Sequence, residues 1–170
     1  GHHHQIAHSL ENDDLTIYRR FGYGTSAFSE GWALYAERLS LEAGLAPDLY
    51  DELGILQSEI FRSVRLVVDT GMHYKKWTRE EAIDYMKDMT GMSDTECRVE
   101  IERYIVWPGQ ALSYKVGMIK ILELRERAME QLGEKFSIKD FHSAVLDNGN
   151  PPLFIAVSYT HLTLPTNLRV

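Results

Sequence analysis

The chain has 170 residues, of which 44% are hydrophobic and 25% are charged, a composition that is ordinary for one globular domain with a real core. The 25 acidic residues outnumber the 18 basic ones and give a net charge of -7. Because no basic stripe offsets this charge, the sequence disfavours nucleic acid as a partner. No apolar run approaches the roughly 18 residues that a transmembrane helix requires. The single cysteine, Cys97, excludes an internal disulfide and is predicted to be a small buried residue.

The first half of the chain is predicted to form helices separated by turns. Helical spacing begins in HHHQIAHSL and breaks at the polar run 11–14, after which YRRFGYGTSAFSEG is expected to be a loop. Amphipathic spacing then predicts a helix from Glu30 that ends at Gly44. A longer helix follows in DLYDELGILQSEIFRSVRLVVDTGMH, and we expect it to end at Gly71.

Local end signals organise the second half. Thr78 with Glu81, and Ser93 with Glu96, each have the spacing of a capping box at the start of a helix. The Pro-Gly pair at 108–109 is expected to end the second of these helices. A long helix is predicted over 110–133, and a last short one in SIKDFHSAVL. Strand patterns are nearly absent from the body of the chain, so the predicted fold class is all-α.

The last fourteen residues differ in character from the rest. VSYTHLTLPTNLRV alternates β-forming residues and threonine, and VSYTHLTLPT resembles the translated read-through of a transposon-based sequencing adapter. We therefore predict that residues 157–170 are not native and that the native part is 1–156. Since one end reads as an assembly scar, we interpret the abrupt start at GHHHQ in the same way and expect the chain to be a fragment.

The histidine run near the start has more than one interpretation. His4 and His8 are four residues apart, a spacing that places two zinc ligands on one helical face. A tag remnant or a solvent-exposed run would explain the same histidines. A tag is normally followed by a linker, whereas QIAHSLEND continues with helical spacing.

A carboxylate at the start of the next helix suggests a third metal ligand. Glu30 is followed by the small residues Gly31 and Ala33, which let another helix approach while Glu30 points into the gap. Glu30 also lies 28 residues after His2. Zinc ligands contributed by a second helix are the usual arrangement in helical metallopeptidases.

A third group of residues offers hydrogen-bond donors. His73 follows a glycine, where its imidazole can turn toward a cleft, and Arg65 and Asp69 have the spacing of an ion pair along one helix. Three further donors suit an anionic tetrahedral intermediate: Arg103, Tyr104 and Tyr114. Each of these residues also fits a structural role, and only their joint occurrence points to function.

Several long segments carry a resemblance to one family. GHHHQ, FSEGWALYAERL, RLVVDTGMHYKKWT, EAIDYM, IERYIVWPGQALSYKVG and FHSAVLDNGNPPL together resemble the C-terminal part of the bacterial family called domain of unknown function 885. That family is similar to zinc metallopeptidases of the gluzincin type. Its metal pattern is His-Glu, two variable residues, Pro-Gly-His-His and a later Gln. Gly1, His2, His3 and Gln5 fit the end of this pattern, whereas His4 stands where an apolar residue is more usual.

The resemblance implies a larger helical domain with a central cleft, one Zn²⁺ ion and a peptide substrate. His2 would be the second zinc ligand, with His3 as the alternative, and Glu30 the third. The first ligand and a glutamate base would precede Gly1. The parent protein would hydrolyse peptide bonds with metal-activated water, while the fragment alone would be inactive. The donors for the intermediate would be, in order of preference, His73 and Tyr114, then Arg103 and Tyr104.

Two other functions remain open on the sequence. One is a non-catalytic helical module of the same family that binds peptides in its cleft. The other is a purely structural helical domain with a chance run of histidines. The compartment is equally open between an exported, periplasmic location and the cytoplasm.

Overall fold

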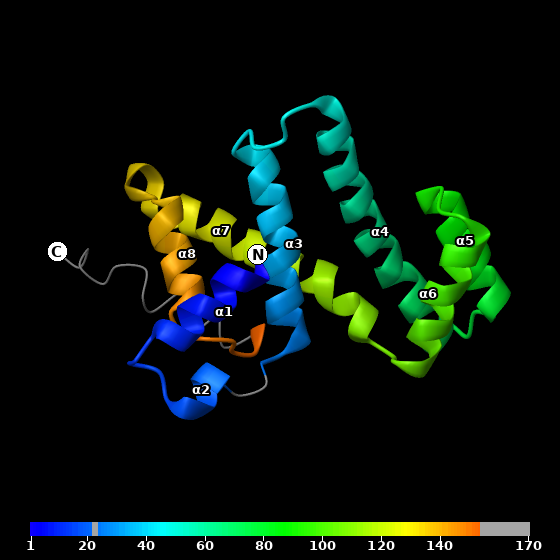
Figure 1. Cartoon of the computed structure of the whole chain (residues 1–170), viewed down its shortest axis with the longest axis horizontal. Helices are drawn as coiled ribbons and strands as arrows, with labels where there is room; N and C mark the ends of the chain where they lie inside the picture. Colours follow the sequence, from blue (N-terminus) through cyan, green and yellow to red (C-terminus); the bar gives the residue numbers. More distant parts are fainter. Residues whose placement is uncertain (22–23, 154–170) are drawn as a thin grey trace. The chain divides into compact units, whose positions relative to one another are not determined.

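The computed structural model describes residues 1–21 and 24–153, and within these ranges every regular element is a helix. This confirms the all-α prediction (Figure 1). The chain divides into two units, one formed by Gly1–Tyr35 with the residues from Val116 onward, the other by Ala36–Lys115. The helices in chain order are α1 (His2–Glu11), α2 (Ile17–Phe21), α3 (Ser26–Glu42), α4 (Leu49–His73), α5 (Arg79–Thr90), α6 (Asp94–Val106), the 3-10 turn η1 (Gln110–Leu112), α7 (Ser113–Leu132), the 3-10 turn η2 (Gly133–Lys135) and α8 (Ile138–Leu146).

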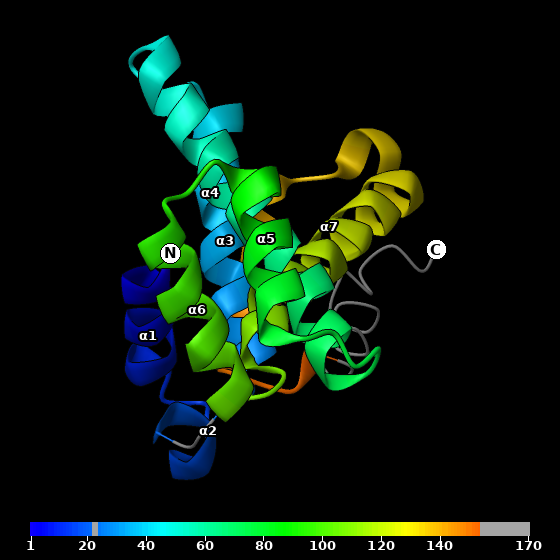
Figure 2. The same ribbon diagram turned by 90° about the vertical axis from the view of Figure 1, so that its right-hand side faces the viewer.

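The second unit is built around the C-terminal half of α4. Helices α5 and α6 form a hairpin and lie side by side in both views (Figures 1 and 2), with α4 packed against them. Cys97 is fully buried in their shared core, as expected. The other buried members of this core are Val64, Val68, Ala82, Ile83, Met86, Ile101, Tyr104 and Ala111.

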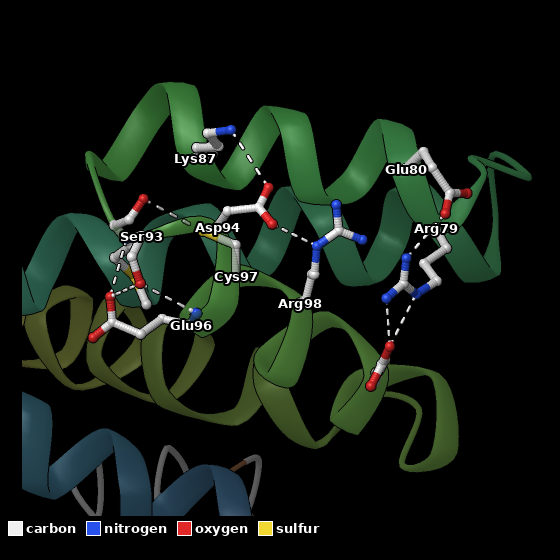
Figure 3. Close-up of polar contacts among 10 residues, drawn as sticks. Arg79, Glu80, Lys87, Ser93, Asp94, Glu96, Cys97 and Arg98 are labelled. Atoms are coloured by element: carbon white, nitrogen blue, oxygen red, sulfur yellow. Dashed lines mark hydrogen bonds and ion pairs between the residues drawn. The ribbon is translucent and has the colours of Figure 1, made fainter.

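Both predicted capping boxes are present and fix the starts of α5 and α6. At the start of α6 the Ser93 hydroxyl accepts from the Glu96 backbone N–H, and the Glu96 carboxylate accepts from the Ser93 backbone N–H (Figure 3). On the surface of the same hairpin, Asp94 pairs with Arg98 at 2.5 Å and with Lys87 at 3.4 Å (Figure 3). Satisfying the free backbone groups locally explains why these two helix starts were predictable from sequence.

The first unit depends on a close approach of two helices. Gly31 of α3 faces Gly117 of α7, and a Cβ built on Gly117 would lie 1.9 Å from the Ala27 carbonyl oxygen. No side chain fits between the two backbones there, so only glycine allows this contact. The buried apolar residues of this unit include Phe28, Trp32, Leu34, Tyr35, Met118, Ile121, Leu124, Ala128, Phe141, Val145 and Leu146.

Two helices differ at one end from the sequence prediction, and one short helix was not expected. Helix α3 begins at Ser26, four residues before the expected start, and the short helix α2 occupies part of the predicted loop. Helix α4 passes through Gly71 and ends at His73. A Cβ added to Gly71 would lie 2.5 Å from the Trp77 indole ring, so glycine at this position serves the packing of Trp77 and does not mark a helix end.

His142 lies in an aromatic cluster of the first unit. Its Nε2 atom is 2.8 Å from the Tyr35 hydroxyl, and its ring meets the Trp32 ring edge-on with centroids 5.4 Å apart. Burial, followed by the positive charges of Arg125 and His4, lowers the pKa of His142. The neutral imidazole is therefore the form that this cluster stabilises.

The stability of the protein should fall in mild acid for this reason. Full stability is expected above the ordinary histidine pKa of about 6.5, where His142 is neutral in both states, and it decreases as the pH falls from there toward the lowered folded value. His142→Gln removes this titration, so its unfolding midpoint should change less between about pH 7.5 and about pH 5.5. Equal pH dependence of the two proteins in thermal unfolding would show that His142 is not the responsible group.

Candidate functional site

The start of α1 lies against α3 and brings the first two predicted metal ligands into contact. His2 Nε2 is 3.2 Å from Glu30 Oε2, with 47% of the His2 side chain and 20% of the Glu30 side chain exposed. A Cβ added to Gly1 would lie only 3.3 Å from the Ala33 Cα. Ala33, one of the small residues predicted to let another helix approach, therefore does so. His2 and Glu30 therefore come from two helices and meet at an open edge.

A second polar contact between the same helices lies one turn along α1. Gln5 is 3% exposed and its Oε1 atom accepts a hydrogen bond of 3.3 Å from the Ser29 hydroxyl. Because Gln5 follows His2 by three residues and Ser29 precedes Glu30 by one, this contact fixes the rotation of α1 on α3. It supports the His2–Glu30 pair from the adjacent turn.

The chemistry of the His2–Glu30 pair fits zinc. Imidazole nitrogen and carboxylate oxygen are ordinary zinc ligands, each at about 2.0–2.2 Å from the metal. Two such atoms in tetrahedral positions are roughly 3.3 Å apart, close to the 3.2 Å between His2 Nε2 and Glu30 Oε2. Among the described residues no group of three or more His, Cys, Asp or Glu side chains could hold a metal ion.

The neighbouring histidines of α1 point elsewhere. His3 lines a shallow pocket with Ile6, Ala7 and Leu10 on the helix surface. His8 Nε2 is 2.6 Å from an Asp147 oxygen, and the His4 and His8 ring centroids are 6.0 Å apart. His2, rather than His3, is thus the histidine that contacts Glu30.

The four predicted donors lie in the second unit, where Tyr104 and Tyr114 contact Arg65. The Arg65 side chain is buried; its Nε donates to the Tyr104 hydroxyl at 2.8 Å, and its Nη2 lies 3.6 Å from Glu100 Oε2. The Arg65 guanidinium also stacks on three rings, those of Phe61, Tyr104 and Tyr114, at 5.0, 5.2 and 4.6 Å. Such stacking offsets part of the cost of burying a cation.

Two of the four donors already donate hydrogen bonds to other side chains of this cluster. The Tyr104 hydroxyl is buried and donates to Glu100 Oε2 at 2.5 Å. Burial and this hydrogen bond raise the pKa of Tyr104 far above its usual range, so its proton stays in place. Arg103 donates to Glu100 at 3.0 Å and to Gln110 at 3.1 Å. Tyr104 and Arg103 therefore hold the cluster together.

Tyr114 and His73 are the more available donors. The Tyr114 hydroxyl makes no hydrogen bond within the described part of the chain, and its ring is held by Arg65. His73 is exposed and its Nε2 lies 3.1 Å from the Tyr104 carbonyl oxygen. Since a carbonyl only accepts, Nε2 carries a proton, and His73 can donate from Nδ1 only as the imidazolium.

The expected ion pair between Arg65 and Asp69 was wrong. Arg65 pairs with Glu100 of α6, while the buried Asp69 accepts from the Gly109 backbone N–H at 3.1 and 3.3 Å. The carboxylate of Asp69 thereby stabilises the turn that follows α6. Glu100 was missed by sequence reasoning, although its position three and four residues before Arg103 and Tyr104 was a usable signal.

These features define an all-α protein whose helices present a His–Glu pair in one unit and an arginine-centred donor cluster in the other. Residues 1–156 match the family described as "Bacterial protein of unknown function (DUF885)". The chain therefore belongs to this bacterial family, which confirms the family resemblance seen in the sequence.

Solved structures with the same fold include two bacterial proteins. A "putative lipoprotein" from Colwellia psychrerythraea is 50% identical, with a TM-score of 0.91 over 96% of this chain and 28% of its own. A "putative lipoprotein of unknown function" from Shewanella oneidensis is 28% identical, with a TM-score of 0.82 over 97% of this chain and 29% of its own. The present chain thus spans less than a third of either protein. A search of curated proteins found no match.

Two further sequence predictions concern the ends and the membrane. None of the helices in the described ranges is long and apolar enough to cross a membrane, in line with the sequence. The predicted non-native tail, 157–170, lies outside the described residues and stays a prediction.

Proposed function

We propose that the parent protein of this chain is a zinc-dependent peptidase and that His2 and Glu30 are two of its metal ligands. The observation that carries the proposal is the contact of an imidazole nitrogen and a carboxylate oxygen at 3.2 Å, from two helices whose rotation is fixed by Gln5 and Ser29. A bound Zn²⁺ ion would supply Lewis-acid activation of a water molecule near neutral pH. By the family pattern, a further histidine ligand and a glutamate base belong to the segment that precedes Gly1 in the parent.

The residues of this chain would then stabilise the reaction intermediate and position the groups that do so. Tyr114 would donate its free hydroxyl to the oxyanion that forms when a peptide carbonyl is attacked. His73 would assist in its imidazolium form, because only that form has a proton to donate from Nδ1. Arg103 and Tyr104 would position this cluster through Glu100. Since both relatives are described as lipoproteins, we also propose that the parent is exported.

Zinc content of single variants tests the ligand assignment. In the parent protein, His2→Ala and Glu30→Gln should each weaken zinc binding strongly, since each removes one of the few protein ligands. His3→Ala is the matched control. Because His3 lies on the outer surface of α1, this variant should retain the metal. Zinc per chain measured after dialysis gives the result. Zinc retained by His2→Ala and lost by His3→Ala would reverse the assignment.

A further inference from the structure

Two arginines share one tyrosine in the second unit. The guanidinium carbons of Arg65 and Arg62 lie 4.6 and 5.7 Å from the centroid of the Tyr114 ring. Both also lie over Phe61, at 5.0 and 5.2 Å. The ring of Tyr114, the most available donor, is therefore in contact with two cations.

The two cations differ in how their charges are balanced. Arg65 is buried and is paired with Glu100 at 3.6 Å. Arg62 makes its hydrogen bonds to Ser58, at 2.9 Å to the hydroxyl and 3.4 Å to the carbonyl oxygen, and it forms no ion pair with any described residue. The Nε atom of Arg62 is buried and has no hydrogen-bond partner among the described residues. A buried N–H without a partner is costly unless a ligand satisfies it.

Two carboxylates that adjoin the Ser58–Arg62 contact, one bonded to Ser58 and one a neighbour in sequence, have other partners. Glu37 accepts from the Ser58 hydroxyl at 2.8 Å, and Glu59 is paired with Lys115 at 2.5 Å. The charge of Arg62 thus remains available for an anion that comes from outside the described chain. Its half-buried position between aromatic rings strengthens attraction to such an anion, because little water screens it.

We propose that Arg62 binds a carboxylate of the peptide substrate. A guanidinium presents parallel N–H donors that match the two oxygens of a carboxylate. A groove of about 260 Å³ begins at the same residues: it is lined by Ser58 and Phe61, which hold Arg62, and by Gly54, Gln57, Thr90 and Met92. A peptide whose carboxylate reaches Arg62 can place an apolar side chain in this groove and a carbonyl near Tyr114.

This inference rests on the proposed peptidase function, and the experiment separates the two. The parent protein is treated with a chelator, so that nothing is cleaved, and its affinity is measured by fluorescence anisotropy for three N-terminally labelled peptides of alanine and phenylalanine. One has a free C-terminal carboxylate, one is amidated, and one is amidated with glutamate as its last residue. Cleavage of the same peptides with zinc present is measured separately.

The free acid should bind about tenfold or more tightly than the amide, as expected for a hydrogen-bonded charge pair. Arg62→Gln should remove this difference, whereas Arg98→Gln, which removes an exposed arginine from α6, should keep it. Tight binding of the glutamate peptide would identify an acidic side chain, rather than the C-terminus, as the carboxylate recognised. Arg62→Gln should leave binding of the amidated peptide unchanged, whereas a loss of overall folding would weaken binding of all three peptides.

Equal affinity for acid and amide, or a ratio unchanged by Arg62→Gln, would overturn the inference. Cleavage without such a ratio would leave the peptidase proposal intact. A ratio that depends on Arg62 without any cleavage would instead support the carboxylate site in a peptide-binding module.

Discussion

Gly117→Ala is expected to destabilise the protein by about 3 kcal/mol or more, because the added methyl group has no space. A Cβ at this position would lie 1.9 Å from the Ala27 carbonyl oxygen and 2.7 Å from the Gly31 Cα. Both are backbone atoms of α3, so they can move only if the two helices separate. Separation would disturb the helix that carries Glu30, and zinc binding by the parent should weaken with stability.

Urea unfolding followed by circular dichroism measures this effect. Gly54→Ala is the matched control, since Gly54 lies within α4 and a Cβ there meets nothing within 4 Å. That change should stabilise the protein by about 1 kcal/mol, the difference in helix propensity between the two residues. If Gly117→Ala unfolded at the same urea concentration as the unchanged protein, the close approach of α3 and α7 would be wrong.

Glu100→Gln is expected to cost about 3 kcal/mol although it preserves the shape of the side chain. The change removes the carboxylate that faces the buried Arg65, and a buried charge that loses its partner is strongly destabilising. The hydrogen bonds from Tyr104 and Arg103 also lose their charged acceptor. Although burial raises it, the hydrogen bonds from Arg103 and Tyr104 bring the pKa of Glu100 below its ordinary value, which shows that the cluster favours the ionised form.

Glu102→Gln provides the control for this prediction on the same helix. The side chain of Glu102 is 57% exposed and pairs with Arg79 on the surface. Surface pairs of this kind contribute about 0–1 kcal/mol, so its removal should change the unfolding midpoint little. Equal effects of the two substitutions would mean that Glu100 does not balance a buried charge.

The helix starts with local signals were predictable from sequence, whereas features set by distant contacts were not. Thr78 with Glu81 and Ser93 with Glu96 cap their helices through side chains within three residues. Gly71 looked like a helix end because glycine usually is one, but Trp77, six residues further on, fills the space beside it. Nothing near Gly71 in the sequence specifies that contact.

The same limit applies to the candidate site. The small residues after Glu30 correctly indicated that another helix approaches there, and the family pattern pointed to His2. The partner of Arg65 was misassigned because its spacing to Asp69 suggested a local pair, while the folded chain provides Glu100 from another helix. Spacing along one helix suggests a possible ion-pair partner, but tertiary packing determines which carboxylate actually pairs with the arginine.

Zinc stoichiometry together with peptide cleavage, both measured on the parent protein recovered from the source DNA, tests the central claim most directly. We predict about one zinc per chain and peptide hydrolysis that stops with a chelator and returns when zinc is restored. Absence of zinc from a parent that carries the His-Glu segment before Gly1 would contradict the claim. The assignment of His2 and Glu30 as ligands would then be withdrawn with it.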